Sequence, residues 1–191
     1  MNIRFVKETD AKDLLAIYAT YVEHTAITFE YDVPSIEEFR SRIKDISSFY
    51  PYLVAEEDGV ILGYAYASSF HPRAAYAWSA EVTIYLKPDT YGKGLGSQLY
   101  EQLEVYLVQM GITNINACIA TTSKETPYLT NGSRYFHEKK GYQLVGTFHK
   151  SGYKFNQWFD MIWMEKMIGE HHDKMTPPQS IHDVTKDEDK A

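Results

Sequence analysis

Three glycines lie close together in the stretch Tyr91-Gly92-Lys93-Gly94-Leu95-Gly96, between an alternating segment and an amphipathic one. Glycine lets a backbone approach a ligand closely, and the first N–H groups of a helix have no partner inside it. Together with the helix dipole, such a turn can bind a phosphate or pyrophosphate. The spacing matches neither the dinucleotide motif, because positions 97 and 99 are Ser and Leu, nor a P-loop. A tight turn with glycines for packing alone is the alternative.

Glu81 is a candidate general base. It lies between Ala80 and Val82 in an alternating segment, with no Lys or Arg two residues away on its own face. A carboxylate that is buried without a partner has a raised pKa and can accept a proton in a reaction. If this face is solvated, Glu81 is an ordinary surface residue without a catalytic role.

His137 and Cys118 are the other two reactive side chains considered. His137 lies four residues after Ser133 in a short predicted helix; most single helical histidines serve packing or the surface, yet imidazole can also exchange a proton near neutral pH. Cys118 is the only cysteine, is expected to be a small core residue, and excludes an internal disulfide and a cysteine metal cage.

The composition narrows the class of protein. A chain of 191 residues with 44% hydrophobic residues is long enough for one folded domain and excludes wholesale disorder. The net charge of −7 and the pI near 5.5 argue against nucleic acid as a partner. The apolar run Val60–Ala67 is far shorter than the roughly 18 residues of a membrane span, and the charged start, Met1 to Lys7, does not resemble a signal peptide. The expectation is a cytoplasmic protein without a membrane partner.

The hydrophobic pattern predicts the elements that must position these residues. Strands are expected over residues 3–6, 52–56, 60–68, 78–86, 114–120, 142–149 and 157–166. Helices are expected after the N-caps Thr9 or Asp10 and Ser35, from Leu95 to Met110, and near residues 132–140. This order predicts a mixed sheet with helices packed on it, an α/β (α+β) domain. From Gly169 to Ala191 the composition predicts a mostly disordered tail.

Four sequence strings follow one another in an order typical of one enzyme family. They are Glu81-Val-Thr-Ile-Tyr-Leu-Lys-Pro, the glycine turn at 92–96, Asn131-Gly-Ser133 and His137-Glu-Lys-Lys-Gly141-Tyr142. The chain resembles the GNAT superfamily of N-acetyltransferases, and within it the phosphinothricin and methionine sulfoximine acetyltransferases. Thr28-Phe29-Glu30, Arg73-Ala-Ala-Tyr76-Ala-Trp78, and Gly152-Tyr153-Lys154 followed by Trp158 and Asp160 extend the resemblance over residues 2–167.

The resemblance implies a single acetyltransferase domain over residues 1–168, with a central, mostly antiparallel sheet of about seven strands flanked by four helices. It implies acetyl-coenzyme A as the donor, with Ile84, Tyr85 and Leu86 pairing their backbone with the pantetheine arm. The residues implied at the pyrophosphate are Gly92, Lys93, Gly94, Leu95, Gly96 and Ser97, and those matching less uniform cofactor positions are Asn131 and Lys139.

The chain departs from the family pattern at two positions. Tyr91 stands where the family usually has Gln or Arg, so one polar phosphate contact is missing by this comparison. Asn131 and Ser133 are two residues apart where the family has three, after what looks like an insertion around residues 122–128. Either Thr130 or Asn131 therefore occupies the family's asparagine position.

The resemblance also implies roles for the reactive residues. Glu81 is expected to deprotonate the attacking ammonium and His137 to protonate the leaving thiolate, with no metal required. Phe29, Glu30, Tyr76 and Trp78 match positions around the acceptor, which predicts a small amino acid or analogue as the amine substrate. A homodimer is expected. The alternatives are an acetyltransferase for protein N-termini or polyamines, and a non-catalytic acyl-coenzyme A sensor, which would not need an ionisable Glu81.

Overall fold

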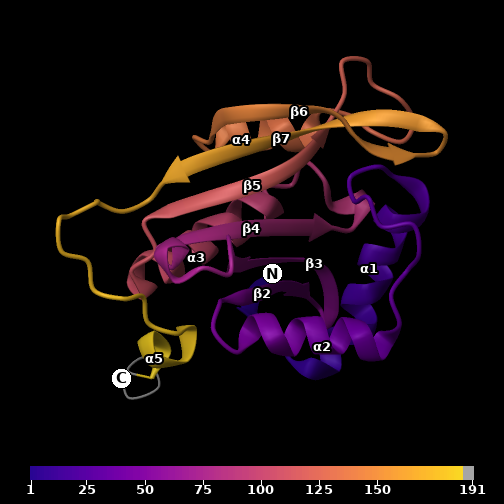
Figure 1. Cartoon of the computed structure of the whole chain (residues 1–191). Helices are drawn as coiled ribbons and strands as arrows, with labels where there is room; N and C mark the ends of the chain where they lie inside the picture. Colours follow the sequence, from indigo (N-terminus) through magenta and orange to yellow (C-terminus); the bar gives the residue numbers. More distant parts are fainter. Residues whose placement is uncertain (187–191) are drawn as a thin grey trace.

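The structure is a computed structural model that describes residues 1–186, and its centre is a seven-stranded sheet in the order β1-β2-β3-β4-β5-β7-β6 (Figure 1). The strands are β1 (Asn2–Phe5), β2 (Tyr52–Glu57), β3 (Val60–Ser69), β4 (Ser79–Leu86), β5 (Asn114–Thr121), β6 (Gln143–Lys154) and β7 (Gln157–Met167). Only β4 and β5 pair in parallel; the other neighbours are antiparallel. The predicted fold class, a mixed and mostly antiparallel sheet of seven strands, is confirmed.

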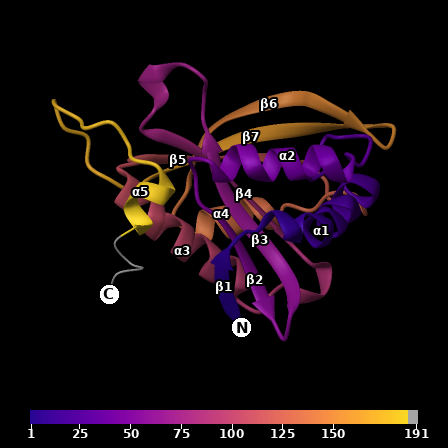
Figure 2. The same cartoon turned by 90° about the horizontal axis from the view of Figure 1, so that it is seen from below.

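Four helices of more than one or two turns cover the two faces of the sheet. They are α1 (Ala11–His24), α2 (Ile36–Ser47), α3 (Leu95–Met110) and α4 (Gly132–Lys139). Figure 2 shows α1 and α2 on one side of the sheet and α3 on the other. The alternation along β4 explains this division: Tyr85 packs among the residues of α1 and α2, whereas Ala80 and Val82 pack with α3.

The helix ends follow the local chemistry of the sequence. Ser35 is the N-cap of α2, as predicted, and its hydroxyl accepts the backbone N–H of Glu38 at 3.1 Å. Helix α3 lies between Gly94, with φ of 80°, and Gly111, with φ of 88°, conformations that suit glycine. None of the helices within residues 1–186 is long and apolar enough to cross a membrane.

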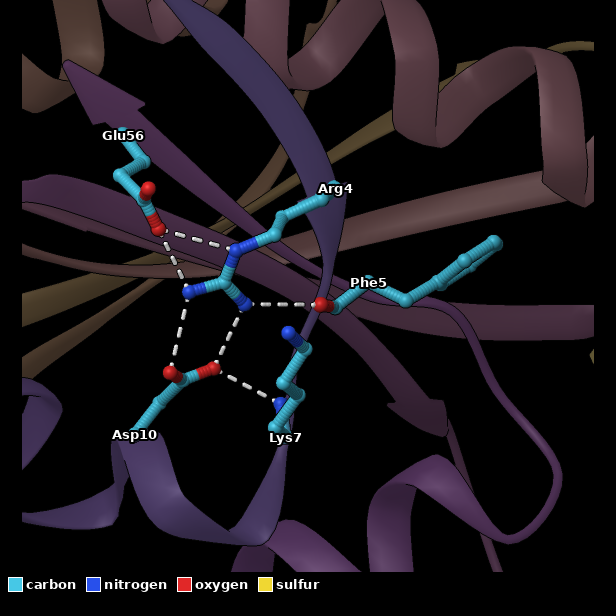
Figure 3. Close-up of polar contacts among 5 residues, drawn as sticks. All are labelled: Arg4, Phe5, Lys7, Asp10 and Glu56. Carbon is cyan, nitrogen blue, oxygen red and sulfur yellow. Dashed lines mark hydrogen bonds and ion pairs between the residues drawn. The ribbon is translucent and has the colours of Figure 1, made fainter. Parts of the chain in front are cut away.

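Arg4 joins β1 to the start of α1 and to β2 through four hydrogen bonds, and a fifth goes to Phe5 O on its own strand (Figure 3). Its guanidinium donates to both carboxylate oxygens of Asp10, at 2.8 and 3.0 Å, and twice to one oxygen of Glu56, at 2.7 and 3.0 Å. The backbone N–H of Lys7 adds a further hydrogen bond to Asp10 at 2.7 Å. Asp10 is therefore fully engaged where the chain turns from the sheet into α1.

The segment after β7 differs from the disordered tail that the sequence predicts, as far as residue 186. It runs past the end of α3, where Gln179 N–H donates to Met110 O at 2.9 Å, and forms a short helix, α5 (Ile181–Thr185) (Figure 1). Ile181 is 3% exposed within the core cluster that surrounds α3. Ile181 and Val184 are three residues apart, a spacing that places them on one face of a helix. The average composition of the segment is polar and hides this pattern. Residues 187–191, also assigned to the tail, lie outside the described residues.

Candidate active site

The candidate active site lies where β4 and β5 separate. The two strands pair only from Ser79 to Glu81 and from Asn114 to Asn116, and beyond that point a cavity of about 420 Å³ lies between them. Residues from both faces of the sheet line it, so the cavity passes through the sheet. Two reactants can therefore enter from opposite faces and meet between the strands.

Glu81 faces the cavity from the side of α1, together with Tyr66 of β3 and Phe29 of the segment between α1 and α2. The side chain is half-buried and makes no hydrogen bond or ion pair within the part of the chain that the structure describes. Burial therefore raises the pKa of its carboxyl group. An unpaired, half-buried carboxylate with a raised pKa is suited to act as a general base, as predicted for Glu81.

Cys118 also lines the cavity, so the prediction of a small core residue is wrong. Its side chain is exposed on the same face as Glu81, while its neighbours Ala117 and Ile119 are buried on the opposite face. Burial by the cavity walls and the negative charge of Glu81 raise the pKa of the thiol to about 11. The thiol is protonated at neutral pH and is a weak nucleophile there.

On the opposite face, His137 of α4 and Tyr100 of α3 line the cavity. His137 Nδ1 lies 2.7 Å from the carbonyl oxygen of Ser133, which can only accept, so Nδ1 carries the proton. Nε2 then accepts a hydrogen bond from the Tyr100 hydroxyl at 3.0 Å. The side chain is 3% exposed, and burial lowers its pKa to about 4.

This geometry corrects the role expected of His137. At neutral pH the ring is uncharged, and neither nitrogen has a proton to donate into the cavity. The contacts instead make His137 a residue that orients the Tyr100 hydroxyl on the α3 face. The sequence could not show this, because Tyr100 and His137 are distant in the chain and meet only by packing of α3 against α4.

The free edge of β4 offers backbone groups to a ligand, but not at all three expected positions. Lys87 N–H donates to Leu62 O on β3, so by the alternation of an antiparallel ladder Tyr85 also faces β3, and Val82 and Ile84 face the gap. Leu86 is already bonded: its N–H donates to the Tyr21 hydroxyl at 3.1 Å, and that hydroxyl donates to Leu86 O at 2.5 Å. The Val82 N–H is used in the parallel pairing of Glu81 with Asn116, so the Val82 carbonyl and the backbone of Ile84 are the groups left to pair with an extended ligand.

Tyr91, the departure from the family pattern, points back toward α1. Its hydroxyl lies 2.5 Å from that of Tyr21, which already accepts from Leu86 N–H and donates to Leu86 O. Tyr91 is therefore the donor in this pair. The polar group that the family places toward a phosphate is used here to tie the glycine turn to α1 and β4.

The glycine turn leads directly into α3. Gly94 has a φ of 80° at the N-cap, and a Cβ built there would meet only the end of Gln98, at 3.9 Å. The backbone at Gly94 therefore borders open space, and the N–H groups of the first turn of α3 have no partner inside the helix, as an anion site requires. Gly96 serves packing instead, because a Cβ there would lie 3.4 Å from Ile84 and Phe136. The packing interpretation therefore holds at Gly96, and the anion site after Gly94 stays a prediction.

Asn131 is used inside the connection between β5 and α4. Its side-chain oxygen accepts from the Thr121 hydroxyl at 2.7 Å and from Thr122 N–H at 3.3 Å, and its amide donates to Thr122 O at 3.0 Å. These contacts use the side-chain oxygen and one of the two amide N–H donors within the chain itself, and the expected cofactor contact stays a prediction. Lys139 is exposed near the end of α4.

Of the four residues predicted around the acceptor, the structure places two at or beside the cavity and two outside its lining. Phe29 lines the cavity, while Glu30 lies beside it and binds the Tyr18 hydroxyl and Arg42, both at 2.9 Å. Tyr76 and Trp78 are not among the described lining residues: Tyr76 packs against Phe70 and His71, and the Trp78 indole donates to Thr176 O at 2.9 Å. Tyr66 and Tyr85 supply the aromatic wall instead.

The residues that sequence reasoning missed share one property. Val82, Tyr66, Tyr100 and Ser151 reach the cavity from four separate elements, and each also fits a core or strand pattern in its own segment. Ser151 lies in a register shift of β6 between Phe148 and Gly152, which only the pairing with β7 reveals.

The fold and the cavity define an enzyme that joins two substrates across a split sheet, and comparison with known proteins identifies its family. The family profile of the acetyltransferase (GNAT) domain matches residues 3–163. The chain belongs to the GNAT acetyltransferase family, as the sequence resemblance implied. Within residues 1–186, no group of three or more His, Cys, Asp or Glu could hold a metal ion.

Individual relatives refine this assignment. The chain is 32% identical to a phosphinothricin N-acetyltransferase of Alcaligenes faecalis, over 87% of this chain and 82% of that protein. It is 26% identical to an L-methionine sulfoximine/L-methionine sulfone acetyltransferase of Salmonella typhimurium, over 90% and 96%. A phosphinothricin acetyltransferase of Sinorhizobium meliloti, solved with acetyl-CoA, has a TM-score of 0.83 and 29% identity, over 94% of this chain and 97% of that one. The prediction of an N-acetyltransferase is confirmed.

Proposed function

We propose that the protein transfers the acetyl group of acetyl-CoA to the primary amine of a small amino acid or amino-acid analogue, with Glu81 as the general base. The observation that carries the proposal is a half-buried carboxylate, unpaired among the described residues, in a cavity lined by residues from both faces of the sheet. The relatives' names, which include phosphinothricin and methionine sulfoximine acetyltransferases, support this class of acceptor.

The chain's own groups fit the donor at three points. The amides at the start of α3, after Gly94, would hold the pyrophosphate, since they are free of internal partners. The carbonyl of Val82 and the backbone of Ile84 would pair with the pantetheine arm along the open edge of β4. The acetyl-CoA thioester supplies an activated acyl carbon at the end of this path.

Glu81 would act on the acceptor side. An amine attacks an acyl carbon only when it is neutral, so a base must first take a proton from the ammonium. The raised pKa of Glu81 brings the carboxylate closer to the proton affinity that this task needs, and its position on the α1 face is opposite the Tyr100–His137 pair. The two reactants would therefore keep to separate faces until they meet in the cavity.

The cavity lining favours a compact acceptor of low charge. Glu81 is the one carboxylate among its described residues, and no lysine or arginine lines it. Tyr66, Tyr85 and Phe29 form an aromatic wall, and Glu30 beside the cavity is paired with Arg42, which also binds Glu38. A polycation would leave several ammonium groups unpaired, at a large desolvation cost.

A thiol-release assay with a panel of amines tests this function. We expect methionine sulfoximine, methionine sulfone or phosphinothricin to give the highest kcat/KM, and kanamycin and spermine to give little turnover. An N-terminal peptide belongs in the panel as a further acceptor. Peptides or polyamines as the best acceptors would contradict the proposed substrate class, and the absence of turnover with every amine would favour an acyl-CoA sensor.

We also propose that two copies of the chain pair through β6. This strand forms one edge of the sheet and carries exposed apolar side chains: Leu144 is 49%, Val145 58% and Phe148 55% exposed. A long apolar edge strand is an aggregation hazard unless something covers it, and a second copy would do so. Analytical ultracentrifugation should give a dimer, and Phe148→Glu should give a monomer; a monomeric parent protein would contradict the proposal.

A further inference from the structure

Lys154, at the end of β6, is a lysine that the fold has buried almost completely. It is 3% exposed, and its ammonium donates to three backbone carbonyls: Val22 at 2.7 Å, Thr25 at 2.8 Å and Thr28 at 3.0 Å. An ammonium has three N–H donors, so all of them are satisfied. The three carbonyls belong to the end of α1 and to the segment that follows it.

That segment forms the acceptor side of the cavity, since Ile27, Thr28 and Phe29 all line it. Lys154 therefore binds the backbone of this wall at Thr28, which lines the cavity, and at Thr25, which comes just before the lining residues. Apart from this ammonium, Ala26 N–H donates to Tyr128 O at 2.9 Å. Ile27 N–H and Glu30 N–H donate to the hydroxyls of Thr25 and Thr28, at 3.2 and 3.4 Å, whereas the carbonyls of Thr25 and Thr28 are bound by the Lys154 ammonium.

Two residues next to Lys154 hold the same wall. A Cβ built at Gly152 would lie 2.3 Å from the ring of Phe29, so Phe29 sits directly against the β6 backbone. The hydroxyl of Tyr31 donates to Tyr153 O. The end of β6 thus fixes the wall by its backbone, by the Phe29 ring and by Tyr31.

We infer that Lys154 is a positioning residue of the acceptor site, which sets the place of Thr28 and Phe29 relative to Glu81 through the three carbonyls that its ammonium holds. The inference rests on the proposed function in one respect, that the acceptor amine occupies the Phe29 side of the cavity. A buried cation is costly to the fold, and its complete satisfaction by the wall's carbonyls is the reason to assign it this task.

The test compares Lys154→Met with Lys166→Met. Lys166 is on the adjacent strand β7, where its ammonium binds Glu104 at 2.7 Å, so the control removes a lysine charge from the same hairpin without touching the wall. In Lys154→Met we expect the acceptor KM to rise by about tenfold or more, because small misplacements near a reacting group have large effects. The acetyl-CoA Kd, measured by calorimetry, should stay within about twofold of the parent value.

A second readout does not depend on turnover. Cys118 is the only cysteine and lines the cavity, so its alkylation rate by iodoacetamide reports how open the cavity is. A displaced wall should raise this rate in Lys154→Met by about tenfold, and leave it unchanged in Lys166→Met. If Lys154→Met does not fold, Lys154→Gln carries the same test, because its shorter side chain removes the charge and one of the three donors but leaves a polar amide at the buried position.

The outcomes separate the inference from the proposed function. Unchanged acceptor KM and unchanged Cys118 reactivity in a folded Lys154 variant would overturn the inference, and so would equal effects on both substrates. Failure of the parent enzyme to acetylate any amino acid would count against the proposed function, and the Cys118 rates would still decide the role of Lys154.

Discussion

Glu81→Gln is expected to lower the turnover number by about 10²–10⁴-fold, the range typical for loss of a general base. The variant keeps the size and shape of the side chain, and the acetyl-CoA contacts proposed for α3 and β4 do not involve it. Calorimetry should therefore give an acetyl-CoA Kd close to that of the parent enzyme. Full activity of the variant at pH 7 would reject Glu81 as the base.

The pH dependence of the same pair sharpens this test. Because burial raises the pKa of Glu81, kcat/KM of the parent enzyme should fall as pH decreases through that raised value. The variant should lose this limb, and its residual rate should follow deprotonation of the free amine. Glu57→Gln is a suitable control, since Glu57 is an exposed carboxylate at the end of β2, and we expect it to leave turnover unchanged.

The stability of Glu81→Gln tests the direction in which the pKa of Glu81 is shifted. A raised folded-state pKa means that the folded chain binds this proton more tightly than the unfolded chain does. The group therefore supports folding below its unfolded pKa, and this support is lost as pH rises through the folded value. At pH 7 the ionised carboxylate opposes folding, so Glu81→Gln should melt at the same temperature as the parent protein or a higher one.

Arg4→Met should lower the free energy of unfolding by about 3 kcal/mol, the largest effect on stability that we expect from a single change. The substitution keeps an apolar stem but leaves Asp10, 7% exposed, without its bidentate partner, and Glu56 without two hydrogen bonds. Urea unfolding followed by circular dichroism measures the change. A loss below about 0.5 kcal/mol, the range of exposed pairs, would contradict the importance of this network.

The control and the pH dependence of Arg4→Met follow from the same contacts. Arg134→Met breaks an exposed pair with Glu138, one turn away on α4, and should cost less than about 0.5 kcal/mol. Burial alone would raise the pKa of Asp10, but the hydrogen bonds from Arg4 and from Lys7 N–H lower it below its ordinary value. This stabilisation is present above the unfolded pKa and is lost as pH falls through the folded one, so the variant and parent should converge in acid.

Local sequence patterns were sufficient for the elements and for the residues whose role depends on their own segment. Alternation along Ser79–Leu86 predicts β4, the Ser35 cap predicts the start of α2, and the glycine turn predicts an anion site at α3. Glu81 could be identified as a candidate base because an isolated carboxylate in an apolar strand is conspicuous within a few residues. In each case the physical cause is short-range in the chain.

The tail shows where this reasoning fails. Ile181 and Val184 pack against the α3 core although the residues around them are polar and charged, and a composition average over the whole segment hides two apolar side chains. Their burial depends on the groove that other elements present, which is a property of the fold.

Contacts between distant segments were decided by the tertiary structure alone. The Tyr100 hydroxyl binds Nε2 of His137, and the Tyr21 hydroxyl binds both backbone groups of Leu86. The ammonium of Lys154 donates to three carbonyls more than a hundred residues earlier in the chain. Sequence by itself determined the family and the sheet and indicated Glu81 as the candidate base, because these follow from side-chain type and spacing along one element. Which partner occupies each polar group was fixed only by packing, because a hydrogen bond needs two atoms within about 3 Å and chain spacing says nothing of that distance.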